Sequence, residues 1–128
     1  VITSGEYAHR GSFKQLLGGN ETEELLELLS LEKQVTEYTP PAFIWHTYTD
    51  QSVPVQNSLL LIEAMKKYEI PVEFHMYPAG GHGLSTCTEQ SMNVDGYGVQ
   101  EQCQSWLPLV RTWLAEKVRC KTDTNVLG

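Results

Sequence analysis

Asp50 and His82 are the two residues whose types and positions in the chain could together do chemistry. Asp50 lies in the stretch HTYTDQSVP and His82 in the stretch YPAGGHGLS, and each stretch begins at the end of an apolar run. An Asp can accept the Nδ1 proton of a His, fix the tautomer of the ring and stabilise the imidazolium. The other ring nitrogen can then take a proton from a nucleophile.

Each of these residues also has an ordinary interpretation. An Asp after a strand is usually a turn former or a helix cap, because its short side chain bonds to nearby backbone N–H groups. A His beside glycines is more often a loop residue than a catalyst. The pair is more specific than either residue alone, provided that the fold brings Asp50 and His82 together.

The elements between the two residues predict that it does. Residues 42–48 and 72–78 are rich in apolar and aromatic residues and predict two strands, the first buried on both faces. A helix is predicted from about residue 56 to 68. The apolar face of this helix carries Leu61, Ile62, Met65 and Tyr68. A strand–helix–strand unit is a right-handed parallel crossover, so Asp50 and His82 follow the carboxyl ends of neighbouring strands.

Further helices flank this unit. Ser12 is predicted to cap a short helix over residues 13–17, and the acidic stretch ETEELLELLS has leucines at helical spacing. The last helix is predicted over about residues 99–117. Its buried face would carry Trp106, Leu109, Val110, Trp113 and Leu114. The chain is therefore α/β, and its two full strands predict a single partial domain over residues 1–128 that forms one flank of a larger sheet.

The stretch PPAFIWHTYTDQSVPVQNSLLLIEAMKKYEIPVEFHMYPAGGHGLS, residues 40–85, resembles the C-terminal part of an α/β-hydrolase. It most resembles the branch that holds acetyl esterases, acetylxylan esterase-like enzymes and prolyl-oligopeptidase-type hydrolases. In that branch an Asp follows an apolar strand and precedes Val-Pro, and a His lies in a Gly-His-Gly loop. The resemblance implies that Asp50 is the acid and His82 the base of a Ser-His-Asp triad, with no cofactor.

The nucleophile that the resemblance implies is missing from these residues. The family order is Ser, Asp, His, so the serine should precede Asp50 on a G-x-S-x-G turn. Ser4, Ser12 and Ser30 lie in the contexts ITSGE, HRGSF and LLSLE, and none is such a turn. An HGGG-type oxyanion segment is also missing. We therefore expect a truncated hydrolase whose isolated chain has little or no acyl-transfer activity.

Two functional hypotheses follow. The first is the C-terminal portion of a serine hydrolase that cleaves small carboxylic esters of the acetyl type, with a small-molecule ester as its substrate. The second is a catalytically inactive hydrolase-derived fragment that acts as a binding or self-assembling module. The exposed sheet edge of so small a sheet invites pairing with another copy, so a homo-oligomer is expected.

Composition and charge exclude other classes of function. The formal net charge of −7 opposes phosphate backbones and anionic membrane surfaces, so neither nucleic acid nor membrane is expected as a partner. No apolar run approaches the roughly 20 residues needed to span a bilayer. No signal peptide opens the sequence, so a cytoplasmic protein is expected, with export left open because residues preceding Val1 could carry such a signal.

Neither a metal site nor a disulfide framework is predicted. The histidines do not share ligand spacing on one element, and no CxxC pair is present. Three cysteines, Cys87, Cys103 and Cys120, leave one unpaired in any disulfide framework. Cys87 and Cys103 flank a glycine-rich loop and could pair in an oxidising compartment, and the sequence leaves this question open.

Overall fold

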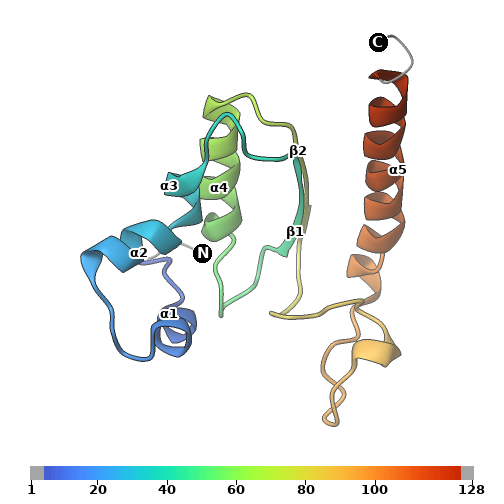
Figure 1. Ribbon diagram of the computed structural model, residues 1–128. Helices are drawn as coiled ribbons and strands as arrows, with labels where there is room; N and C mark the ends of the chain where they lie inside the picture. The colour runs from blue at the N-terminus through green and yellow to red at the C-terminus, as the bar shows by residue number, and fades with distance from the viewer. Residues whose placement is uncertain (1–4, 125–128) are drawn as a thin grey trace. The chain divides into compact units, whose positions relative to one another are not determined.

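The computed structural model describes residues 5–124, with side chains as far as residue 117, so Cys120 lies outside the described side chains. The chain divides into two compact units, residues 1–82 and residues 83–128. Figure 1 labels the elements of each unit along the chain. The single partial domain expected over residues 1–128 stays a prediction.

The first unit contains a parallel pair of strands joined by a helix. Strand β1 runs over Ala42–Thr47 and strand β2 over Val72–Tyr77, with Ala42 opposite Val72. Helix α4, Gln56–Lys67, connects them and supplies the predicted crossover. Both strands end within one residue of the predicted boundaries, because proline precedes the first strand and follows the second.

The core of this unit lies around α4. Met65 is 2% exposed. It packs with Ala64 and with Val35, which lies in the loop that leads into β1. Partly buried residues complete the cluster, namely Ala42, Leu61, Ile70 and Val72. Because Ala42 and Val72 open the two strands, this cluster fixes the amino ends of the strands against the helix.

The sheet is less buried than the sequence predicts. The strand over residues 42–48 was expected to be buried on both faces, yet in β1 only Thr47 is buried and the other residues are half-buried. The physical reason is the number of layers. In Figure 1 helix α4 and the shorter helices that precede β1 all lie on one side of the sheet.

Short helices precede the strands: α1, Arg10–Leu17; α2, Glu23–Leu29; and α3, Leu31–Gln34. Thr22 caps α2, because its Oγ1 accepts a hydrogen bond from the Leu25 N–H at 3.3 Å. The prediction that Ser12 caps α1 is wrong. The helix already begins at Arg10, and the Ser12 hydroxyl instead lies 2.8 Å from Nδ1 of His9.

The second unit contains two 3-10 turns, η1 over Glu89–Ser91 and η2 over Glu101–Cys103, followed by helix α5, Trp106–Thr124. The helix begins later than the predicted residue 99. Pro108 lies in its first turn, where an absent N–H leaves no hydrogen bond unmade. The apolar face predicted to be buried is only half-buried, and Leu114 is 51% exposed.

Cys87 and Cys103 are both present as thiols, and both are 0% exposed. Burial raises the pKa of each thiol, that of Cys103 to about 11. Among the described residues, no helix has the length and apolar character that crossing a membrane requires.

Candidate active site

Asp50 is held in the turn that follows β1. Its N–H donates a hydrogen bond to the Thr47 carbonyl at 3.2 Å. Oδ1 accepts hydrogen bonds from the backbone N–H groups of Ser52 and Val53, each at 2.9 Å. Because this oxygen is anchored by two donors and Asp50 is only 8% exposed, the carboxylate has a fixed orientation.

His82 is carried by a glycine loop that is fastened to the end of β1. The Thr47 hydroxyl donates to the carbonyls of Gly80 and Gly81 at 3.1 Å each. The N–H of Gly80 donates to Thr49 Oγ1 at 2.9 Å. Gly80 has φ 149°, a conformation that side chains rarely adopt. The two threonines therefore set the path of the loop, a role that the sequence analysis missed.

The structure brings the two predicted residues together. Nδ1 of His82 lies 2.8 Å from Oδ2 of Asp50. A carboxylate only accepts hydrogen bonds, so this contact selects the tautomer of His82 with its proton on Nδ1 and its lone pair on Nε2. The side chain of His82 is 51% exposed, whereas that of Asp50 is 6% exposed. The imidazole is thus accessible while its partner is buried.

The environment of Asp50 favours the charged carboxylate. Burial by itself raises the pKa of Asp50. The hydrogen bonds from the Val53 N–H and from His82, the charge of His82 and the bond from Ser52 together outweigh burial, and the pKa lies below its ordinary value. Asp50 is therefore ionised at neutral pH, which is the state that can stabilise an imidazolium.

His46 supports the Asp50 turn from the strand behind it. Its Nε2 lies 2.8 Å from the Val53 carbonyl oxygen and 3.6 Å from Oδ2 of Asp50. A carbonyl accepts, so Nε2 carries the proton and Nδ1 accepts the hydrogen bond from the Ser58 hydroxyl at 2.8 Å. From the sequence, His46 was interpreted only as a structural residue of the first strand. The signal in the sequence is its position: His46 lies four residues before Asp50, close to the end of the same strand.

His9 is a further residue near the pair that the sequence did not indicate. Its ring is stacked on that of His82, with ring centroids 6.4 Å apart and an interplanar angle of 27°. The preceding segment is tied to α4, because the Asn57 amide donates to the Tyr7 carbonyl at 2.9 Å. His75, in contrast, contacts Glu73 at 2.8 Å and belongs to the strand rather than to the site.

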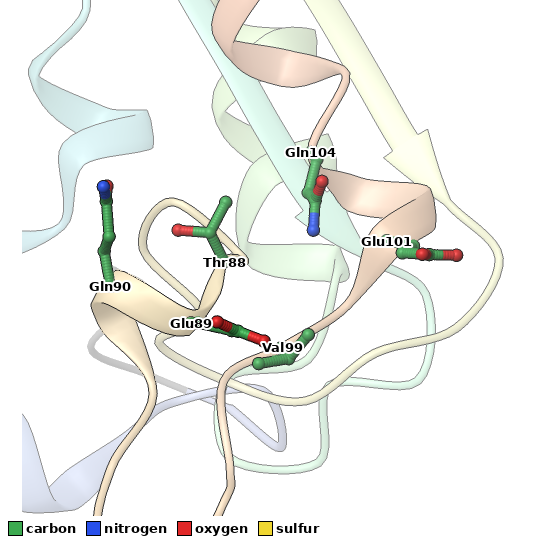
Figure 2. A pocket seen from close by; sticks show the side chains of 6 residues that line it. All are labelled: Thr88, Glu89, Gln90, Val99, Glu101 and Gln104. Atoms are coloured by element: carbon green, nitrogen blue, oxygen red, sulfur yellow. The ribbon is translucent and has the colours of Figure 1, made fainter.

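The second unit has a polar hollow of its own (Figure 2). Its volume is about 460 Å³, and its walls come from η1 and from the segment that leads into α5. The lining residues are Thr88, Glu89, Gln90, Val99, Glu101 and Gln104. The hollow has carboxylates and amides but no imidazole or thiol, so it does not offer the histidine base of a Ser-His-Asp triad. No cluster of three or more His, Cys, Asp or Glu fit for a metal ion occurs in the described part of the chain.

Known proteins support the assignment to a family. Residues 3–97 match the prolyl oligopeptidase family. Over 90 residues the chain is 47% identical to the endo-1,4-beta-xylanase B of Butyrivibrio fibrisolvens, a match that covers 70% of this chain and 14% of that protein.

Solved structures have the same fold. The acetyl ester-xyloside bifunctional hydrolase of Caldicellulosiruptor lactoaceticus is 42% identical, with a TM-score of 0.65 over 86% of this chain and 39% of that chain. A carboxylesterase of Lactobacillus plantarum WCFS1 is 29% identical, with a TM-score of 0.68 over 78% of this chain and 39% of that chain.

The chain thus spans about two fifths of these structures and a seventh of the curated relative. The parallel strands, the crossover helix and the relatives confirm the predicted α/β fold class, and the chain is a fragment of the α/β-hydrolase fold. With three quarters of its residues in the match, this chain belongs to the prolyl oligopeptidase family of α/β-hydrolases.

Proposed function

We propose that this chain is the C-terminal portion of a serine hydrolase that cleaves small carboxylic esters. The observation that carries the proposal is the 2.8 Å contact between Nδ1 of His82 and Oδ2 of Asp50, at the carboxyl ends of two neighbouring parallel strands. Open α/β sheets bind ligands at this edge. The names of the relatives, a carboxylesterase and an acetyl ester-xyloside hydrolase, agree with ester substrates.

In the proposed reaction, Nε2 of His82 takes the proton of a serine hydroxyl while that oxygen attacks the ester carbonyl. The same nitrogen then gives the proton to the leaving alcohol, and water releases the acyl group by the reverse sequence. Asp50 holds the ring in the required tautomer and stabilises the imidazolium. The serine and the oxyanion donors come from residues outside this chain, because the sequence has no G-x-S-x-G turn.

The proposed substrate is an acetylated sugar. One relative is named for acetyl ester and xyloside hydrolysis, and another is named as a xylanase. The acyl group of such a substrate is small, and its alcohol is a pyranose.

A hybrid enzyme tests this proposal. In the Caldicellulosiruptor hydrolase, the segment that matches this chain is replaced by this chain. We expect the hybrid to hydrolyse p-nitrophenyl acetate and the 128-residue chain alone to do so no faster than buffer. A folded hybrid that shows no ester hydrolysis, beside an active parent enzyme, would contradict the proposal.

We also propose a second candidate function, self-assembly through the sheet. The described sheet has two strands, and the residues of β1 from Ala42 to His46 are only half-buried. A sheet of this size gains stability from added strands. Size-exclusion chromatography with light scattering is expected to give dimers or larger species, and a uniform 14.5 kDa monomer would refute this candidate.

A further inference from the structure

The start of helix α1 and the preceding His9 line a hollow, and the ring of His9 is stacked on that of the proposed base. The hollow has a volume of about 580 Å³, and it is shallow and open to solvent. It is lined by His9, Gly11, Ser12, Gln15 and Leu16. Since the ring of His9 is stacked on that of His82, the hollow begins next to the imidazole.

The position of His9 is fixed from two sides. The Ser12 hydroxyl, one turn along α1, lies 2.8 Å from its Nδ1. The bond between the Asn57 amide and the Tyr7 carbonyl ties the preceding segment to α4. With Nδ1 occupied by Ser12, Nε2 lies on the side of the ring that faces Gly11, where a Cβ would come within 3.7 Å of it.

The walls suit a particular kind of group. Leu16 and the methylenes of Gln15 offer apolar surface, while the His9 ring and the Gln15 amide offer hydrogen bonds. A pyranose has apolar faces and a hydroxylated edge, so it matches this mixture. The leaving oxygen of an ester must lie within hydrogen-bond reach of Nε2 of the general acid. The alcohol part of the substrate therefore lies against His82, on the surface that His9 extends.

We propose that the hollow along α1 is the subsite for the sugar alcohol, with Nε2 of His9 contacting a sugar hydroxyl. This inference rests on the proposed esterase function. It adds a binding surface and a specificity residue that the Asp50–His82 pair does not require.

Gly11 provides the test. A Cβ there would meet Cε1 of His9 at 3.4 Å, an ordinary contact, so alanine fits while a larger side chain fills the hollow. In the hybrid enzyme, Gly11→Leu is compared with Gly11→Ala on ethyl acetate and on an acetylated methyl xyloside. We expect Gly11→Leu to raise KM for the sugar ester about tenfold. Its kcat/KM on ethyl acetate should fall by a much smaller factor than its kcat/KM on the sugar ester.

His9→Ala is expected to raise KM for the sugar ester by a larger factor than it raises KM for ethyl acetate. Loss of activity toward both esters to the same extent in Gly11→Leu and His9→Ala would overturn the subsite, because the effect would then not depend on the alcohol. Circular dichroism confirms that each variant folds, and leucine is a better helix former than glycine.

A binding measurement separates this inference from the proposed chemistry. The 128-residue chain is titrated with methyl xyloside and followed by NMR. Shifts confined to α1 and His82, and lost in Gly11→Leu, support the subsite even if the hybrid proves inactive. An absence of shifts at tens of millimolar xyloside refutes the subsite, even if the hybrid hydrolyses esters.

Discussion

Replacing His46 with leucine should destabilise the chain by removing the support of the Asp50 turn. The side chain of His46 is 11% exposed, and its two nitrogens contact the Val53 carbonyl and the Ser58 hydroxyl, each at 2.8 Å. Leucine has a similar volume but no hydrogen-bonding group. Both partners would then face an apolar side chain.

The size of the effect follows from these two contacts. An unsatisfied buried polar group costs about 1–3 kcal/mol. Val53 and Ser58 are half-buried, so water can partly replace the lost bonds and the lower end of that range applies. We expect His46→Leu to lower the free energy of unfolding by about 2 kcal/mol. His46→Gln, whose amide can donate to Val53 and accept from Ser58, should cost less than about 1 kcal/mol.

Urea denaturation of the 128-residue chain, followed by circular dichroism, measures both variants. Ser58→Ala serves as a control, because it removes only one of the two bonds, and its expected cost is about 1 kcal/mol. A His46→Leu variant within about 0.5 kcal/mol of the unsubstituted chain would refute the reasoning, since that is the scatter of neutral surface changes. Equal costs for leucine and glutamine would refute it too.

Three further predictions concern stability and reactivity. The pKa of Asp50 is lower in the folded chain than in the unfolded chain. The carboxylate therefore contributes its full share of the free energy of unfolding above pH about 4, the ordinary carboxyl pKa, and loses it as the pH falls through the folded pKa. The gap in urea midpoint between the chain and its Asp50→Asn variant should therefore shrink as the pH falls below about 4, and a gap that widens would contradict this. Met65→Ala should cost about 2–5 kcal/mol in the same assay, and a cost below 1 kcal/mol would exclude Met65 from the core. Cys87 and Cys103 should react with a thiol reagent far more slowly in the native chain than in urea, because both are buried and have raised pKa values.

Local sequence patterns were sufficient to predict the elements that position the site. The two apolar runs and the helical spacing between them predict the crossover, and the rules of parallel sheets place Asp50 beside His82. Each of these inferences depends on residues that are near one another in the sequence or on a general rule of topology. These inferences predict that Asp50 and His82 lie close together, and the structure gives a distance of 2.8 Å between Oδ2 of Asp50 and Nδ1 of His82.

The sequence could not predict the residues that support the pair. His9 follows Tyr7, which is held against α4 by the Asn57 amide, and no periodic pattern encodes its contact with His82. His46 and Thr47 look like ordinary strand residues until the loops that they hold are known. The predicted burial of β1 on both faces was wrong for a related reason. Whether a face of the sheet is buried depends on the helices that pack on it, and the residues of the strand do not specify those helices.

Ester hydrolysis by the hybrid enzyme with His82→Ala tests the assignment of the proton-transferring residue most directly. His75→Ala is the matched control, since His75 lies on β2 and contacts Glu73 instead of Asp50. We expect His82→Ala to lower kcat/KM by about 10³-fold or more, and His75→Ala to leave it within about twofold. If His82→Ala stays within about tenfold of the unsubstituted hybrid, His82 is not the base and the Asp50–His82 pair is not catalytic.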